Sequence, residues 1–406
     1  MTNLQKTFSL TLLSAALLTL TACGGGGGGG EATLTPTPTP TPGKVTFDAT
    51  AVINNEADAV IAQTYKNLNS QAAVLLKAVE AFKDGVTEAE MDTAQNSWKA
   101  ARVPWETSEG FLFGPVDALG IDPAIDSWPL NTPDLQDFLA AKPNATQDDI
   151  ENASDDLRGF HAMEYLLFGD GVNINDKAAS KMTLAEVNYL VALAQAFKAK
   201  TQELENGWVV DFNGKGPYVT QVKTAGAGSA LYSSQAAVME ELVNGLAGIA
   251  DEVANAKMTE PFGPSIDKAD TSLVESQYSW NSLTDFHNNI QSVLNVYTGK
   301  IGYSPSKDSI SANLNGVYAF VLKHDSALAN RVLAEIIDAQ QKIALIKGDG
   351  NPNTTAITGS AKPFRTQISD SNGRVLIQTA IDASNKLFAT LEKEVMPLVA
   401  KTEFSK

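Results

Sequence analysis

The chain has 406 residues and a formal net charge of −17 at pH 7, from 47 acidic and 30 basic residues. This charge argues against nucleic acid and anionic membrane surfaces as partners, because both repel an acidic protein. Cys23 is the single cysteine. Disulfides, thiolate zinc sites, iron–sulfur clusters and a cysteine nucleophile are therefore excluded from the rest of the chain.

The N-terminus is typical of a lipoprotein signal peptide. Lys6 supplies a positive charge, and residues 8–20 (FSLTLLSAALLTL) form an apolar stretch too short to span a membrane comfortably. Small residues then precede Cys23, as a lipoprotein signal peptidase requires. The sequence predicts removal of residues 1–22 and lipidation of Cys23. The alternative is an ordinary signal peptide followed by an incidental cysteine.

Residues 23–44 have the composition of a tether. Seven glycines, Gly24–Gly30, form a flexible coil, and Thr35–Pro42 (TPTPTPTP) form a stiffer polyproline II segment. The sequence thus predicts an exported protein whose membrane partner is reached through the lipid on Cys23. Gly24, in place of an aspartate after the cysteine, favours the outer membrane of a Gram-negative envelope.

The remaining sequence predicts an all-α fold. Thr87 and Glu90 form a capping-box pattern, and no convincing strand pattern occurs. Residues 111–146 are rich in Gly and Pro, which predicts a long irregular stretch with at most a short helix near 133–141. Helices are predicted over 50–83, 87–110, 147–168, 183–206, 230–256, 271–299, 306–323, 325–347 and 372–403.

A break at 207–229 divides these helices into two groups of about four. Long antiparallel helices with modest connections make bundles, so two packed four-helix-bundle-like halves are expected, at 45–206 and 230–406, joined by the connector 207–229. Self-similarity between the halves is weak, and an internal repeat stays a hypothesis.

His161 and Glu164 form the first constellation that could carry chemistry. They are three residues apart on a predicted helix that is otherwise largely apolar, so their side chains share one face. Such a pair can bind a metal, or the carboxylate can fix the histidine tautomer. The simpler interpretation is a surface pair. The H-E-x-x-H pattern of zincins is absent from the sequence.

Two further groups of polar residues follow helical spacing. Trp98, Arg102, Trp105 and Glu109 fall within roughly 60° of one another on a helix. Glu275, Ser279, Ser282, Asp285 and Asn289 form a polar stripe on the predicted helix 271–299. The simpler interpretations are a structural Arg–carboxylate contact and a solvated helix face.

Taken together, these segments resemble the imelysin family, also described as insulin-cleaving membrane proteases and iron-regulated envelope proteins. Residues 159–169 (GFHAMEYLLFG) look like the family's GxHxxE signature. The other motifs are WKAAR at 98–102 with SEGFLFGP at 108–115, and ESQYS at 275–279 with Ser282, Asp285 and Phe286. Pro363-Phe364 fits a looser motif, and the resemblance spans roughly 50–402.

The resemblance implies two helical halves with a pocket between them and a role in iron acquisition. Carboxylates, an imidazole and hydroxyls suit iron or another first-row metal, while haem stays open as the ligand. The expected metal residues are His161 and Glu164, and the expected pocket residues are Arg102, Trp105, Glu109, Ser279, Ser282 and Asp285.

Three functions follow from this interpretation. The first is an envelope lipoprotein that binds iron or an iron-containing ligand, with an iron-uptake receptor or permease as a partner. The second is a metallopeptidase in which His161 and Glu164 hold the metal and Glu109 acts as general base. The third is a scaffold, or a module that binds a ligand other than a metal.

Overall fold

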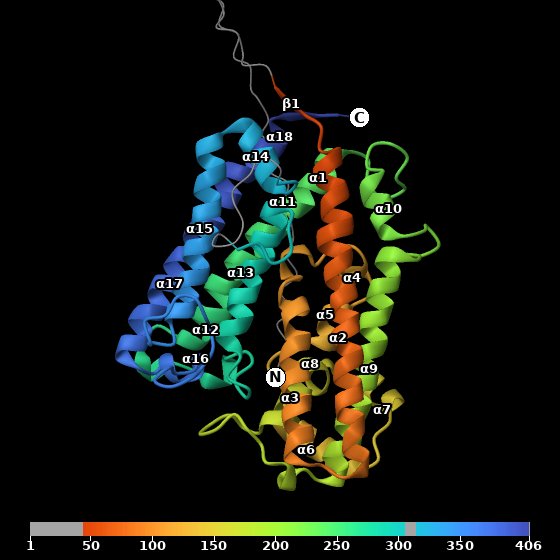
Figure 1. The fold of residues 1–406 in the computed structure, drawn as a ribbon, viewed down its shortest axis with the longest axis vertical. Coiled ribbons are helices and arrows are strands. Elements are labelled where there is room, and N and C mark those ends of the chain that lie inside the picture. Colours follow the sequence, from red (N-terminus) through yellow and green to blue (C-terminus); the bar gives the residue numbers. More distant parts are fainter. Residues whose placement is uncertain (1–43, 305–313, 406) are drawn as a thin grey trace, which may run out of the picture. The chain divides into compact units, whose positions relative to one another are not determined.

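The computed structural model describes residues 44–304 and 314–405. The predicted signal peptide, the predicted lipidation site Cys23 and most of the tether lie outside these residues. The described chain is all-α apart from two three-residue strands, which confirms the predicted fold class (Figure 1).

The helices and strands have the following bounds. The α-helices are α1 (Thr50–Asn55), α2 (Gln63–Glu80), α3 (Glu88–Glu106), α4 (Pro115–Ala118), α5 (Ile121–Ile125), α6 (Thr132–Ala141), α7 (Gln147–Glu151), α8 (Gly159–Phe168), α9 (Leu184–Val209), α10 (Tyr218–Lys223), α11 (Gln235–Glu252), α12 (Thr259–Phe262), α13 (Ser282–Thr298), α14 (Val317–His324), α15 (Ser326–Leu345), α16 (Phe364–Gln367), α17 (Ser371–Thr390) and α18 (Met396–Ala400). Three π-helical turns continue helices: η1 (Glu56–Ala62), η6 (Val253–Met258) and η9 (Leu391–Val395). Short 3-10 turns are η2 (Ala81–Asp84), η3 (Glu109–Phe111), η4 (Asp155–Leu157), η5 (Ala179–Lys181), η7 (Ile266–Lys268) and η8 (Thr271–Leu273), and the strands are β1 (Val45–Phe47) and β2 (Thr402–Phe404).

The helices pack as two groups within residues 44–406. In the first group, α2 contacts α3 and α9, and both of these contact α8. In the second group, α11, α13, α15 and α17 close a ring, each helix contacting the next (Figure 1). Buried aliphatic and aromatic side chains fill both groups as one continuous core.

The two groups meet at the C-terminal end of α3. There α3 packs against α13, and η3 packs against α11 and α13. Close approach is possible because both contacting backbones carry glycine. A Cβ on Gly245 of α11 would lie 2.2 Å from the carbonyl oxygen of Gly110. The end of α3 and the turn that follows it are thereby fixed against the second group.

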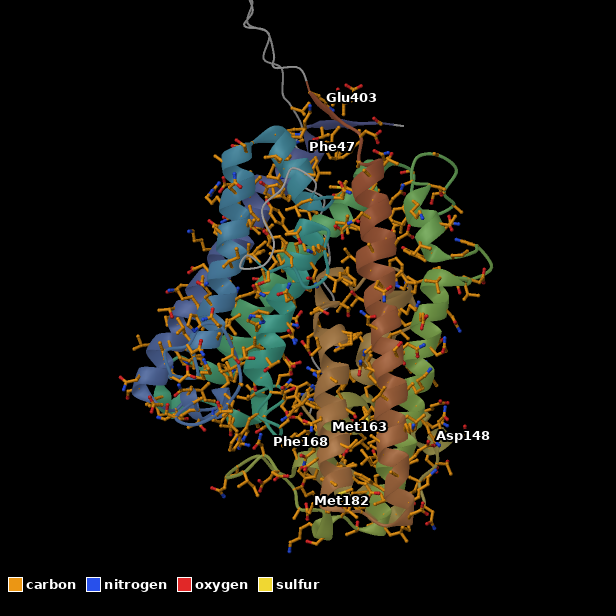
Figure 2. All side chains as sticks on the ribbon, in the orientation of Figure 1. Phe47, Asp148, Met163, Phe168, Met182 and Glu403 are labelled. Atoms are coloured by element: carbon orange, nitrogen blue, oxygen red, sulfur yellow. The ribbon has the colours of Figure 1, made fainter. Side chains whose placement is uncertain are left out.

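The strand pair corrects the expectation that the chain contains no strands. β1 and β2 pair in parallel, with Val45 opposite Thr402 and Phe47 opposite Phe404. Figure 2 labels Phe47 and Glu403 on these strands. Three residues are too few to show an alternating pattern, and the partner strand is far away in sequence. The described chain therefore begins and ends side by side.

Some predicted helices are shorter than expected. α3 ends at Glu106 instead of residue 110, and α13 starts at Ser282 instead of residue 271. The predicted helix 147–168 is divided, because Gly159 has φ +78° and starts a new helix there. α9 extends to Val209, three residues into the predicted connector. Of the predicted helix 306–323, residues 305–313 lie outside the described part, and α14 begins only at Val317.

Candidate functional site

Arg102 is the centre of a buried network of charges. It lies on α3 where the two helix groups meet, and its side chain has no exposed area. Its guanidinium is 3.1 Å from both Glu275 and Asp285, and it also pairs with Asp126 and with Glu106 one helical turn later. The Arg102 guanidinium therefore contacts four carboxylates: one on α3 itself, one after α5, one in the turn before α13 and one on α13.

Asp126 joins the arginine to the predicted histidine. It follows α5 directly, inside the Gly- and Pro-rich stretch. One carboxylate oxygen accepts a 2.5 Å hydrogen bond from the Trp105 indole, and the other contacts Arg102 and lies 3.2 Å from Nε2 of His161. Sequence analysis did not single out Asp126, since nothing local marks one aspartate in an irregular segment.

His161 is completely buried, and its two ring nitrogens face different groups. Nδ1 is 3.1 Å from a carboxylate oxygen of Glu164, as the helical spacing predicts. Nε2 faces Asp126 and, at 4.0 Å, Glu275, yet makes no hydrogen bond of good geometry within the described residues. The Trp128 ring packs against the imidazole at a centroid distance of 4.6 Å.

Asp126, His161 and Glu275 form what we call the acid–imidazole cluster. Each offers one ligand atom, and the three atoms lie within 4.8 Å of one another. Carboxylate oxygens and a neutral imidazole nitrogen together are suitable ligands for iron and other first-row divalent ions. Glu106 and Glu109 make a second group with Asp126, and this group offers carboxylate oxygens only.

Glu164 lies on the other side of the imidazole from this cluster. Its Oε1 accepts hydrogen bonds from the backbone N–H of Ser279 at 2.8 Å and from the Ser279 hydroxyl at 2.7 Å. Its Oε2 faces Nδ1 of His161. The structure therefore brings the predicted residues His161, Glu164 and Ser279 together, with Glu164 holding the ring nitrogen that points away from the cluster.

Lys257 is the second permanent cation of the network, and sequence analysis did not predict it. Its ammonium is 3.0 Å from Oε2 of Glu275, 3.8 Å from Glu252 and 3.9 Å from Glu106. It lies on the π-helical turn η6. Such turns often occur at functional sites, but no sequence signal identifies one.

A cavity of about 400 Å³ opens beside the cluster. Its wall is rich in acid groups: Glu109, Asp122, Asp126, Glu252, Glu260 and Glu275, together with Lys257. Of the predicted pocket residues, Glu109 lines this cavity. Arg102, Trp105 and Asp285 lie behind it in the buried network, and the Ser282 hydroxyl donates to the backbone carbonyl of Glu275 at 2.6 Å.

The carboxylates outnumber the cations, and their pKa values reflect this imbalance. Burial raises the pKa of Glu106 and of Glu109 well above the usual value, although Arg102 and Lys257 oppose the effect. Burial and the charge of Asp126 raise the pKa of Asp122 to about 7. Groups that retain protons near neutral pH for lack of a counter-charge are sites where an added cation is favourable.

Two groups of the cluster have pKa values set by each other. Burial alone would lower the pKa of His161, but the nearby carboxylates of Asp126 and Glu164 raise it to about 9. Burial alone would raise the pKa of Asp126, but Arg102 and His161 hold it well below the usual value. The metal-free cluster therefore contains an imidazolium beside an ionised aspartate at neutral pH.

These features define an all-α protein with a buried cluster of carboxylates and one imidazole where two groups of helices meet. The imelysin family model, also named Peptidase_M75, matches residues 61–391. The chain belongs to the imelysin family, which confirms the resemblance seen in the sequence.

Similar proteins cover nearly the whole chain. Iron-regulated protein A of Synechococcus elongatus is 29% identical over 354 residues, covering 86% of this chain and 88% of that protein. The crystal structure of a Parabacteroides distasonis protein described as an iron-regulated protein A precursor is 27% identical, with a TM-score of 0.72, and covers 89% of this chain and 98% of that chain. An imelysin-like protein from Psychrobacter arcticum, 14% identical with a TM-score of 0.61 over 88% of this chain and 98% of its own, shows the same fold.

Proposed function

We propose that this protein binds iron, or an iron-containing ligand, at the acid–imidazole cluster and acts in iron acquisition at the cell envelope. The observation that carries the proposal is the convergence of Asp126, His161 and Glu275, with the Nε2 of a completely buried histidine left without a hydrogen-bond partner in the described structure. The names of the relatives from Synechococcus elongatus and Parabacteroides distasonis support iron as the metal.

The charges around the cluster favour uptake of a cation. Glu106, Glu109 and Asp285 surround it in addition to Asp126 and Glu275, whereas Arg102 and Lys257 are the permanent cations in contact with them. A divalent ion at His161 Nε2 would replace protons now held by imidazole and carboxylates. The neutral imidazole and the ionised carboxylates are the forms that bind such an ion.

Arg102 and Lys257 would respond differently to a metal ion entering the cluster. Arg102 is buried and pairs with Glu106 of α3 and with Glu275 and Asp285 of the second group, so it has a structural part in the site. Lys257 lines the cavity with its ammonium on Glu275, where an entering cation would lie. Metal entry therefore requires Lys257 to move aside, which a long flexible side chain can do at modest cost.

The test is metal binding by the purified protein, by calorimetry, with ferrous iron under anaerobic conditions, ferric citrate, zinc and haem. The variants are Asp126→Asn, Glu275→Gln and the His161→Ala/Glu164→Ala double variant. His324→Ala is the matched control, because His324 lies on α14, where its Nε2 forms a hydrogen bond with the Thr402 hydroxyl and not with the cluster. Stoichiometric binding that the cluster variants lose and the control keeps supports the proposal. Equal binding by all variants, or none by the parent, overturns it.

A metallopeptidase is the second candidate, and the position of Glu109 favours it. Glu109 lines the cavity beside the cluster. Burial raises its pKa and keeps its carboxyl protonated, and a metal cation in the cluster would favour its ionised form, which could then act as the general base. The family model's second name also refers to a peptidase. The test is cleavage of unstructured peptides with added divalent metals. Cleavage that Glu109→Gln abolishes without weakening metal binding would establish it.

Attachment to the envelope is part of the proposal. Residues 1–22 and Cys23 have the lipoprotein pattern, and a Gly- and Thr-Pro-rich segment precedes the helical part. None of the helices in residues 44–304 and 314–405 is both long and apolar enough for a membrane crossing. A lipid on Cys23 would hold the protein at the membrane, with an iron-uptake receptor or permease as a partner. Radiolabelled fatty acid incorporation by the wild type and not by Cys23→Ala is the test.

A further inference from the structure

A second cavity, of about 500 Å³, lies between α3, α13 and the segment 354–358. Its wall includes Lys99 and Val103 of α3, residues 279–281, and Thr284 of α13. It shares no lining residue with the acidic cavity. Its volume is in the range of roughly 300–1,000 Å³ that is usual for small-molecule sites. We call it the Lys99 cavity.

Lys99 has a cationic group that lacks a counter-ion. Within the described ranges its ammonium makes no hydrogen bond or ion pair, and its only ring contact is with Phe168, 5.2 Å from the centroid. Burial lowers the pKa of Lys99, and the more distant charges of Asp176 and Glu164 oppose that shift. A partly desolvated ammonium with three free donors is a favourable place for an anionic group.

The rest of the wall is rich in hydroxyl and amide groups. Thr354, Thr355 and Thr358 approach from the segment 354–358, which a 2.9 Å hydrogen bond between the hydroxyls of Thr355 and Thr284 ties to α13. Asn175 donates to the backbone carbonyl of Ser279 at 2.8 Å, which leaves its side-chain oxygen available. Hydroxyls both donate and accept, so this wall suits a ligand that carries hydroxyl as well as carboxylate oxygens.

The turn that closes the cavity has an unusual backbone. Ser276 and Trp280 both have positive φ, at +49° and +62°, although neither is glycine. The Trp280 indole donates to the carbonyl oxygen of Gly171 at 2.8 Å, which fixes this conformation. Sparsely populated backbone conformations held in this way concentrate at ligand sites.

We propose that the Lys99 cavity binds a small hydroxycarboxylate anion. One carboxylate of the ligand would pair with the Lys99 ammonium, and its hydroxyl and other carboxylate oxygens would form hydrogen bonds with the threonine side chains. The site is separate from the proposed metal site and needs no metal. Ser279 connects the two sites: it lines the Lys99 cavity, and its backbone N–H and hydroxyl both donate to Glu164. A bound anion would therefore contact the turn that orients His161.

The test is calorimetric titration with citrate, on protein stripped of metals by a chelating resin and in a metal-free buffer. The variants are Lys99→Met, which keeps the apolar stem, and Lys99→Arg, which keeps the charge. Lys77→Met is the matched control, because Lys77 is an exposed lysine on α2 with the same charge. Thermal melting checks that each variant remains folded.

The expected result is citrate binding that weakens at least about tenfold in Lys99→Met, as the loss of a charge-assisted hydrogen bond implies. Lys99→Arg and Lys77→Met should stay close to the parent, and tricarballylate, which lacks the hydroxyl, should bind more weakly than citrate. No binding at millimolar citrate, or equal binding by folded Lys99→Met, would overturn the proposal. Because the titration uses metal-free protein and variants outside the acid–imidazole cluster, failure of the metal proposal and failure of this one are distinguishable.

Discussion

Ser279 donates its backbone N–H and its hydroxyl to the same carboxylate oxygen of Glu164, at 2.8 and 2.7 Å. The other oxygen of Glu164 is thereby left to face Nδ1 of His161 at 3.1 Å. Since the imidazole is held through Nδ1, its Nε2 points toward Asp126 and Glu275. A serine from the second helix group therefore sets the direction of a histidine in the first.

The first prediction concerns the hydrogen bonds that connect Ser279, Glu164 and His161. Glu164→Gln should weaken divalent-metal binding by about 10–100-fold, because a partner that fixes the tautomer and orientation of a ligating histidine has effects of that size. Ser279→Ala should have a smaller effect, since the backbone N–H remains. Calorimetric metal titration measures both. Ser265→Ala, whose hydroxyl donates to the exposed Asp267, is the control. Parental affinity in Glu164→Gln would show that Glu164 does not orient the site.

The second prediction concerns Lys257 as an internal competitor. Lys257→Met removes a cation 3.0 Å from Glu275 and keeps much of the apolar stem. Divalent-metal affinity should rise, by about tenfold or more if the charge alone is decisive, because the carboxylates then lack a resident counter-ion. The same titration measures it, with the exposed Lys77→Met as the control for net charge. Weaker binding by folded Lys257→Met would instead make the ammonium part of ligand recognition.

The third prediction is a pH dependence of metal binding. The pKa of His161 is raised to about 9 by Asp126 and Glu164 against the effect of burial, so the imidazole holds a proton at neutral pH. Asp122, with a pKa of about 7, holds a proton in part. Because a metal at Nε2 must displace the imidazolium proton, and because ionisation of Asp122 adds negative charge to the cavity wall, affinity should increase from pH 6 to 9. Calorimetry in buffers of different ionisation enthalpy counts the protons released. Affinity that is flat over this range would contradict the assignment of His161 as a ligand.

The sequence was sufficient for the elements of the fold that rest on local patterns. The apolar spacing and the capping box at Thr87 and Glu90 predict α3, and both capping hydrogen bonds form. The same local reasoning pairs His161 with Glu164. It could not find Asp126, because an aspartate in an irregular segment acquires its role only when α5 is placed against α8. Lys257 was missed for the same reason.

The prediction that residues 271–281 belong to an α-helix is wrong, yet the polar side chains expected there to lie together do converge. Helical spacing suggested that Glu275, Ser279 and Asp285 share a face, but α13 begins only at Ser282. The turn before it instead carries Glu275 to Arg102 and Ser279 to Glu164. The residues converge through a turn with two positive φ angles, a conformation that sequence patterns do not indicate for Ser276 and Trp280.

The last prediction tests how the cluster depends on a backbone contact. A Cβ on Gly159, which has φ +78°, would lie 2.3 Å from the carbonyl oxygen of Ile125. Gly159→Ala should therefore destabilise the fold by about 2–4 kcal/mol, from backbone strain and displacement of the neighbouring segment. Because Asp126 follows Ile125 directly, metal affinity should fall as well. Gly248→Ala is the matched control.

Gly248 lies inside α11 with open space around its Cβ position, so alanine there should stabilise the protein by about 0.5–1 kcal/mol. Urea unfolding gives both free energies, and metal titration of the folded variants gives the affinities. If Gly159→Ala is as stable as the parent and binds metal equally well, then the approach of Ile125 to α8 does not position Asp126. Destabilisation with unchanged metal affinity would separate the two effects, and would assign the placement of Asp126 to its side-chain contacts with Arg102, Trp105 and His161.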